Sequence, residues 1–130
     1  MKREHGFTVI EIIAVILFLG VATTLLLIQR ANLAASQRDN DRKTAINAMY
    51  YNLEEVFYEQ NGYYPSKIDS KTLRAMDPAL FTDPDGIKLD EAGSTYRYEA
   101  TNCTDTKCKS YSLRADLEKE ADFVKTNRNK

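Results

Sequence analysis

The chain has no tryptophan, three prolines and a single histidine, His5, among its 130 residues. Because that histidine precedes the first apolar run, the rest of the chain cannot assemble a histidine-based metal site or acid–base pair. A basic excess is also missing, since 18 lysines and arginines stand against 19 acidic residues, and this balance argues against a nucleic-acid-binding surface. The sequence contains no glycine-rich phosphate loop and no nucleophile with a histidine base, so we expect no enzymatic activity.

The apolar run Phe7–Ile28 contains one charged residue and no proline. As a helix it would be about 33 Å long, enough to cross a bilayer core of about 30 Å. Lys2 and Arg3 precede the run and Arg30 follows it, and a short basic leader of this kind favours a cytoplasmic N-terminus. We therefore expect a transmembrane helix over residues 7–29, with residues 30–130 facing outward.

The sequence predicts that one helix extends over Phe7–Gln60, because only Gly20 interrupts the helix-forming residues and membrane helices tolerate glycine. Beyond the apolar run, apolar residues recur at three- and four-residue spacing, which indicates one buried stripe on a water-exposed helix. Asn61-Gly62 is a left-handed cap signal and Pro65 follows, so we expect the helix to end there. The stripe consists of Leu33, Ile46, Met49, Tyr50, Leu53, Val56 and Phe57, with Arg38, Asp41, Arg42, Asn52 and Glu55 between them.

Strands are expected near the C-terminus. Thr95–Ala100 and Tyr111–Leu117 place large apolar side chains on one face at period two, which predicts an antiparallel pair whose connecting loop holds both cysteines. A third short strand is expected around Phe123-Val124, followed by a polar, frayed tail over Thr126–Lys130. A long helix packed on a small antiparallel sheet makes the predicted fold class α+β.

The segment between the long helix and the strands is rich in turn signals. Ser70–Met76 predicts a short helix capped by Ser70 or Asp69. Further on, four acidic residues surround a glycine turn, and their oxygen atoms could ligate calcium. Their spacing differs from that of an EF-hand, so a solvated loop with Asp-Pro and Asp-Gly turns is the alternative. The four are Asp83, Asp85, Asp90 and Glu91, of which the three aspartates are the calcium candidates.

The two cysteines, Cys103 and Cys108, lie in the C-terminal third. If that third is outside the membrane, both are in an oxidising compartment and can form a disulfide. A zinc site is the alternative, but with no histidine available it would lack ligands. A disulfide that closes so short a loop is expected to stabilise the fold by about 2–3 kcal/mol.

Glu11 is the one charged residue inside the apolar run. A charge within a membrane costs a few kcal/mol, so this carboxylate needs a partner. Cleavage between Gly6 and Phe7 would create an α-amine one helical turn away, and that amine is mostly protonated near neutral pH. In a stack of subunits with an axial offset, Glu11 of one chain could instead pair with the Phe7 amine of its neighbour. Such a pair is strong only when its geometry is right, so it would set the register between subunits.

The short charged leader, the sequence Gly6-Phe7-Thr8-Val9-Ile10-Glu11 and the unbroken apolar run together resemble the N-terminus of the type IV pilin family, which includes the pseudopilins of type II secretion and competence systems. The segment Tyr58–Pro65 is similar to the helix exit of many of these proteins. The resemblance implies a pilin-like fold and removal of the leader, residues 1–6, by a prepilin peptidase. The mature chain would then begin at Phe7, commonly N-methylated, and Glu11 would act in assembly.

The same resemblance implies a structural subunit of a type IV pilus-like filament. Before assembly it would be a single-pass protein of the inner or cytoplasmic membrane, N-in and C-out, and afterwards part of a cell-surface filament. The implied partners are identical or related pilins, the prepilin peptidase, a membrane platform protein and a cytoplasmic motor ATPase. Apart from the calcium candidates no cofactor is implied. The alternatives are a pseudopilin of a type II secretion or competence system, and a monomeric membrane-anchored binding domain.

Overall fold

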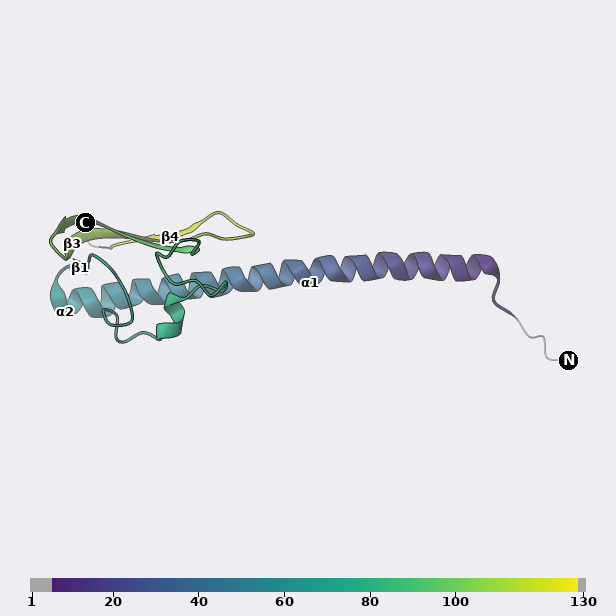
Figure 1. Ribbon diagram of the computed structural model, residues 1–130, viewed down its shortest axis with the longest axis horizontal. Coiled ribbons are helices and arrows are strands. Elements are labelled where there is room, and N and C mark those ends of the chain that lie inside the picture. Colours follow the sequence, from purple (N-terminus) through teal and green to yellow (C-terminus); the bar gives the residue numbers. More distant parts are fainter. Residues whose placement is uncertain (1–5, 129–130) are drawn as a thin grey trace. The chain divides into compact units, whose positions relative to one another are not determined.

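The computed structural model describes residues 6–128 and has an α+β fold, a long helix followed by a small antiparallel sheet (Figure 1). Of the expected leader, residues 1–5, including Lys2, Arg3 and His5, lie outside the described residues. The chain divides after Ala35 into two compact units. Its elements are α1 (Val9–Tyr51), the π-helix η1 (Asn52–Tyr58), α2 (Glu59–Asn61), β1 (Tyr64–Pro65), the 3-10 helix η2 (Pro78–Phe81), β2 (Tyr96–Thr104), β3 (Lys107–Ala115) and β4 (Phe123–Thr126).

The helical segment runs from Val9 to Asn61, close to the predicted Phe7–Gln60. Near its end the α-helical turns are replaced by the wider π-helical turns of η1. In η1 the larger π turn buries three consecutive residues, which the α-helical spacing of the sequence did not predict. Gly62 ends the helix as expected, with φ of 71° and its N–H donating to the carbonyl of Tyr58 at 2.7 Å. The three consecutive buried residues are Asn52, Leu53 and Glu54.

β3 is the central strand of a four-stranded sheet. It pairs antiparallel with β2 on one edge, while β1 and β4 both pair with its other edge, β1 at the start of β3 and β4 at its end. The expected third strand is thus present as β4, and the two-residue β1 is an addition to the prediction. Only Asp105 and Thr106 connect β2 to β3. The prediction that the connecting loop holds both cysteines was therefore wrong, because Cys103 lies in β2 and Cys108 lies in β3.

The expected disulfide joins Cys103 in β2 to Cys108 in β3. The two residues lie directly opposite each other in the strand register, so the bond links the strands close to the turn. Cys108 is completely buried, whereas Cys103 is exposed. The bond therefore ties the exposed tip of the hairpin to the core.

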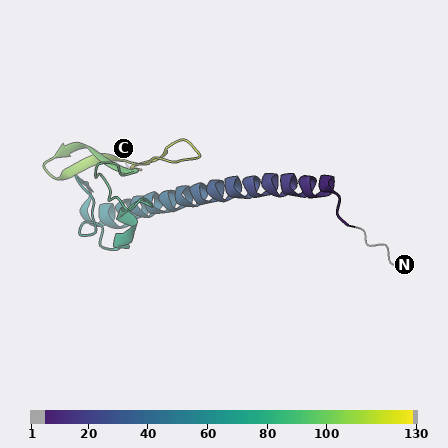
Figure 2. The same ribbon diagram turned by 45° about the vertical axis from the view of Figure 1, so that its right-hand side comes forward.

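The core of the second unit lies between its helix and the inner face of the sheet. In both ribbon views the sheet lies over the teal, C-terminal part of the helix (Figure 1 and Figure 2). Ile46, Met49 and Leu53 of the predicted stripe are fully buried, whereas Leu33, in the first unit, is 70% exposed. The sheet and loops supply the rest of the core, mainly Tyr64, Ile68, Leu73, Met76, Phe81, Tyr96, Tyr98, Cys108, Tyr111 and Leu113.

Ser70–Met76, predicted as a helix, is a series of turns. Asp69 does cap the first turn, because its Oδ1 accepts the N–H groups of Lys71 at 2.9 Å and Thr72 at 2.8 Å. The chain then buries both Leu73 and Met76 before the separate 3-10 helix begins at Pro78. Burial of these two side chains against the core, and the proline that follows, prevail over the helical propensity of a short segment.

Arg42, predicted between the stripe residues on the water-exposed side, is in fact buried, with 2% of its side chain exposed. Its guanidinium group binds three carboxylates, those of Asp39 at 2.9 Å, Glu118 at 2.8 Å and Asp85 at 3.1 Å. Arg38 donates two further hydrogen bonds of 2.7 Å to Glu118. A buried charge is tolerated only when it is paired in this way, so these side chains act as one network.

Asp39 extends this network to the backbone. Its carboxylate accepts the N–H groups of Glu118 and Lys119, each at 2.9 Å, as well as the guanidinium of Arg42. Burial acts to raise the pKa of Asp39, but these hydrogen bonds outweigh burial and hold the pKa below its usual value. The network therefore fastens α1 to the segment between β3 and β4.

The described part of the C-terminal tail is docked and not frayed, so that prediction was wrong for it. Thr126 belongs to β4. The side-chain oxygen of Asn127 accepts the N–H of Tyr111 at 3.2 Å, and the N–H of Arg128 donates to the carboxylate of Glu54 at 3.2 Å. A polar sequence did not imply disorder here because polar groups of Asn127 and Arg128 find partners in the fold.

We expect Arg42→Ala to destabilise the second unit by about 3–5 kcal/mol, because it leaves the buried carboxylate of Asp39 without its cation. Arg38→Ala is the matched control and is expected to cause a much smaller loss, since the Arg38 side chain is 39% exposed. Urea unfolding of the full chain in detergent, followed by near-ultraviolet circular dichroism, would measure both. All tyrosines lie at or beyond Tyr50, so this signal reports on the second unit. Equal losses for the two variants would contradict the network.

Acid is expected to weaken the same contacts. Hydrogen bonds from Arg38 and then Arg42 lower the pKa of Glu118 from 4.5 to about 2. Since the pKa is lower in the folded state, this contribution to stability is complete above pH 4.5, declines between about pH 4.5 and 2, and is absent below that range. Glu118→Gln should flatten the dependence of the unfolding midpoint on pH over this interval. An unchanged slope would mean that Glu118 does not titrate with folding.

Candidate functional site

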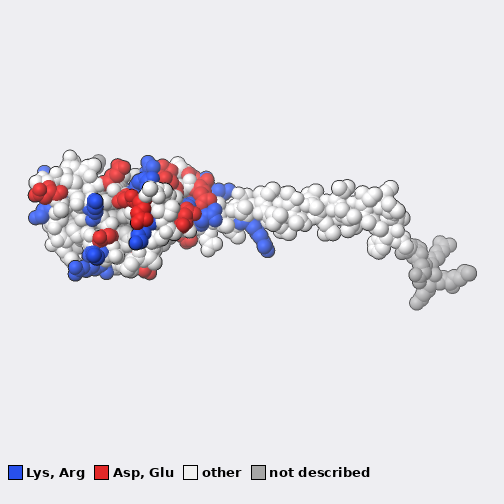
Figure 3. Space-filling view, viewed as in Figure 1, with Lys and Arg blue, Asp and Glu red and all other residues white. Residues whose placement is uncertain are grey.

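The N-terminal helical segment exposes apolar side chains on every side. Phe7 is 81% exposed and Ile10 is 79% exposed, values typical of side chains with nothing packed against them. Figure 3 shows this segment as an unbroken uncharged surface on the face drawn. Its length and composition suffice to cross a membrane. The side chains exposed by 49% or more are those of Phe7, Val9, Ile10, Ile12, Ile13, Val15, Ile16, Leu17, Phe18, Leu19, Val21, Leu25, Leu26, Leu27 and Ile28.

Every polar side chain within Phe7–Ile28 is hydrogen-bonded inside the segment. The hydroxyl of Thr23 donates to the carbonyl of Leu19 at 2.7 Å, and that of Thr24 donates to the carbonyl of Gly20 at 2.9 Å. The other two polar side chains, Thr8 and Glu11, bond to each other. Unpaired polar groups are unfavourable in an apolar environment. The hydroxyls of Thr8, Thr23 and Thr24 each have a hydrogen-bond partner, so none of them is unpaired.

Thr8 and Glu11 form a reciprocal cap at the start of α1. The carboxylate Oε2 of Glu11 accepts the backbone N–H of Thr8 at 3.0 Å and its hydroxyl at 3.2 Å. In return the hydroxyl oxygen of Thr8 accepts the N–H of Glu11 at 3.3 Å. This is a capping box, and the pattern Thr-x-x-Glu before an apolar run is its sequence signal. The predictions from the sequence included Glu11 as an assembly residue but not as part of a cap with Thr8.

Both bonds to Thr8 use the same oxygen of Glu11. Within residues 6–128, the other oxygen, Oε1, has no hydrogen-bond donor. An ionised carboxylate offers several acceptor positions, so Oε1 can accept a further donor without disturbing the cap. The predicted cleavage junction lies next to this site, since Gly6 and Phe7 precede α1 in irregular, exposed chain.

The calcium candidates are separated by their hydrogen bonds. Asp83 accepts the N–H groups of Ile87 at 2.8 Å and Thr95 at 2.9 Å, while Asp85 pairs with the buried Arg42. Burial acts to raise the pKa of Asp83, but its backbone hydrogen bonds prevail and lower it. Asp90 accepts the N–H of Tyr98, and Glu91 is exposed. Among residues 6–128, no three acidic, cysteine or histidine side chains are grouped to hold a metal ion.

Glu54 is a buried carboxylate that no local sequence pattern indicates. Its side chain accepts the hydroxyls of Tyr111 at 2.8 Å and Tyr64 at 3.1 Å, beside the Arg128 N–H already described. Burial, and then the hydrogen bond to Glu54, raise the pKa of Tyr111 and keep its hydroxyl protonated as a donor. The neighbouring Glu55 is exposed, and only the wider π turn decides which of the two points inward.

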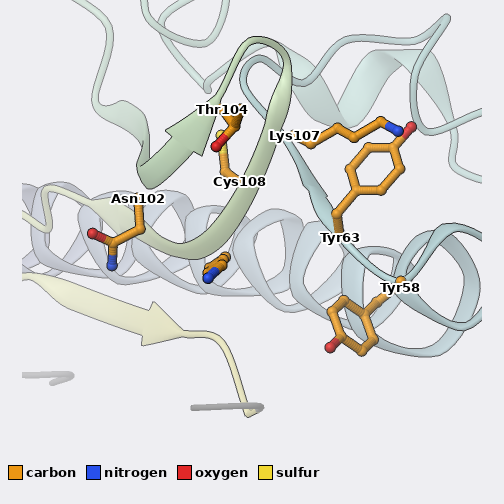
Figure 4. Close-up of a pocket in the computed structure, with 8 residues that line it drawn as sticks. Tyr58, Tyr63, Asn102, Thr104, Lys107 and Cys108 are labelled. Atoms are coloured by element: carbon orange, nitrogen blue, oxygen red, sulfur yellow. The ribbon is translucent and has the colours of Figure 1, made fainter.

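A cleft of about 400 Å³ lies beside the disulfide at the tip of the β2–β3 hairpin (Figure 4). On one wall, the ammonium group of Lys107 lies 5.1 Å from the centre of the Tyr63 ring. The cleft is lined by Tyr58, Gly62, Tyr63, Asn102, Thr104, Lys107, Cys108 and Lys109. These groups can contact a polar ligand, but among the lining residues no nucleophile is paired with a general base.

No protein-family model, curated protein or solved structure matches this chain. The function must therefore be inferred from the residues and their geometry. The geometry brings Gly6, Phe7, Thr8 and Glu11 together at one end of an exposed apolar helix.

Thr8→Ala should open the start of α1, because the loss of an N-cap costs about 1 kcal/mol and speeds amide exchange about fivefold. Hydrogen exchange of the Glu11 amide in the full chain, held in detergent micelles, measures the change. Thr23→Ala is the control, since its hydroxyl bonds only a carbonyl in the middle of the segment. Exchange at Glu11 that is equal in wild type and Thr8→Ala would show that the cap is not formed.

Proposed function

We propose that this protein is a structural subunit of a type IV pilus-like filament, assembled through its N-terminal helix after cleavage between Gly6 and Phe7. The observation that carries the proposal is the exposed apolar helix over residues 9–28, which begins at the proposed cleavage junction with Glu11, a carboxylate whose Oε1 has no hydrogen-bond donor among residues 6–128. The fold is compatible with a pilin-like arrangement, a long helix with a small antiparallel sheet on its C-terminal part.

An apolar helix of this kind needs lipid or other helices around it. Before assembly, lipid would surround the segment, with the N-terminus in the cytoplasm and the sheet outside. In a filament, the same side chains would pack against helices of neighbouring subunits. The exchange replaces one apolar environment by another, so helix packing and specific polar contacts would determine the arrangement.

Glu11 would provide the specific contact. Removal of the leader would leave a positively charged amine at Phe7, and Oε1 of Glu11 has room for such a donor. A pair between Glu11 and the Phe7 amine of the next subunit would be strong in a helical core of low dielectric only at the correct axial offset. The uncleaved leader would block this pair, so cleavage would permit assembly.

The proposed partners are identical or related subunits, a prepilin peptidase, a membrane platform protein and a motor ATPase. A pseudopilin of a type II secretion or competence system would use the same residues, and its assembly would differ in length and location. The monomeric membrane anchor stays as a second candidate because of one observation. The capping box gives Glu11 a complete local role without any neighbour.

Two variants separate these candidates. Glutamine at the third helical position still forms a capping box, so Glu11→Gln removes the charge and keeps the cap. Thr8→Ala removes the two hydrogen bonds of the Thr8 hydroxyl and keeps the charge. In cells that carry the assembly machinery, we expect both to be processed to a Phe7 start. Loss of a buried ion pair costs about 3–5 kcal/mol, so Glu11→Gln should reduce sheared filament yield at least about tenfold. Thr8→Ala should reduce it far less.

The opposite order would mean that Glu11 acts in assembly only as a cap. Wild-type chain that is absent from the sheared fraction and keeps residues 1–6 would support the monomeric anchor. Filament yields equal to wild type for Glu11→Gln would remove the proposed pairing. A chain recovered from membranes with residues 1–6 still attached would remove the proposed cleavage. Processed chain that stays in the membrane fraction would favour the pseudopilin over a surface pilus.

A further inference from the structure

The tip of the β2–β3 hairpin contains the sequence Asn102-Cys103-Thr104. It is the one place in the chain where an asparagine is followed, two residues later, by serine or threonine. Asn-x-Ser/Thr with a residue other than proline in the middle is the acceptor pattern for N-linked glycans on surface segments of exported proteins. We propose that Asn102 carries an N-linked glycan.

The hairpin presents this acceptor openly. Asn102 and Thr104 are both exposed, and both line the cleft beside the disulfide (Figure 4). Asn102 and Thr104, whose hydroxyl the pattern requires, are therefore both accessible from solvent.

The backbone at Asn102 departs from the regular strand. Its φ is 55°, in the left-handed region that asparagine tolerates better than most residues. The strand register pairs Thr101 with Ser110 and Cys103 with Cys108, but it omits Asn102. Within residues 6–128, the side chain of Asn102 has no hydrogen-bond partner. The acceptor is therefore held neither by the sheet nor by a side-chain contact.

The middle residue of the pattern supports the same compartment. Cys103 forms the disulfide with Cys108, and structural disulfides persist in oxidising compartments outside the cytoplasm. N-linked glycans are attached to exported segments. The disulfide and the glycan therefore both require the hairpin to lie on the outer side of the membrane. This inference rests on the outward orientation of the sheet, which the proposed function includes, and needs neither cleavage at Gly6 nor assembly.

The chemical step uses a polyprenyl-pyrophosphate-linked sugar as donor and a membrane glycosyltransferase as catalyst. The side-chain nitrogen of Asn102 forms a bond to the anomeric carbon of the first sugar. The bond between that carbon and the pyrophosphate oxygen breaks, and the polyprenyl pyrophosphate leaves with the electron pair. The amide nitrogen loses one proton to a base of the transferase. No oxidant or reductant is required.

Peptide mass spectrometry of full chain isolated from its native membrane or filament fraction tests the proposal. We expect the peptide containing Asn102 to be heavier than its sequence by at least one sugar residue, with fragmentation placing the sugar on Asn102. Asn102→Gln and Thr104→Val should both lose the added mass completely. Thr104→Ser, which keeps the pattern, should retain it. Asn61→Gln, which alters an exposed asparagine outside any such pattern, is the matched control and should also retain it.

Near-ultraviolet circular dichroism of each variant would establish that the second unit is folded. An Asn102 peptide of unmodified mass, or a sugar placed on Thr104 or another hydroxyl, would overturn the proposal. The N-terminus read from the same sample keeps the two proposals apart. A glycan on a chain that retains residues 1–6 would support this inference and contradict the proposed function. A chain that begins at Phe7 and carries no glycan would contradict this inference and support the proposed function.

Discussion

The apolar helical surface over residues 9–28, whose large side chains are exposed in the described part of the chain, is the constraint on which the rest of the molecule depends. The side chains over residues 9–28 are exposed in every direction, and water is a poor solvent for them. Lipid or other helices would meet the requirement of this segment for an apolar environment. Its hydroxyls, which bond to carbonyls of their own helix, suit either environment. Membrane insertion and polymerisation through this segment answer the same physical requirement.

The second unit meets a different requirement, which is to fix a helix to a small sheet that offers little apolar area. It does so with polar groups placed inside the fold. Arg42 joins α1 to the carboxylates of Asp39, Asp85 and Glu118, and Glu54 joins η1 to two tyrosines of the sheet. Because each of these bonds needs a particular geometry, they define one register of helix against sheet more strictly than apolar contacts would.

Glu11 illustrates how one side chain can have a local and an assembly role. Its Oε2 closes the capping box with Thr8, so the helix start is stable before any neighbour arrives. Its Oε1 accepts no hydrogen bond from the described part of the chain, and a contact between subunits would use this oxygen. The two roles need not compete, since they use different oxygens of the carboxylate. A membrane carboxylate held in this way would be paired partly within its own helix and partly by its neighbour.

The sequence by itself determined the helix over residues 9–61, its glycine end, the two main strands and the disulfide, because helical periodicity, turn residues and strand alternation are local properties. It also contained the pattern at Gly6–Glu11. Only the tertiary structure decided that Arg42 and Glu54 point inward, that residues 70–76 form turns, and that the calcium candidates bond elsewhere. Those outcomes depend on partners far along the chain, which bring compensating charges and donors that no local pattern reveals.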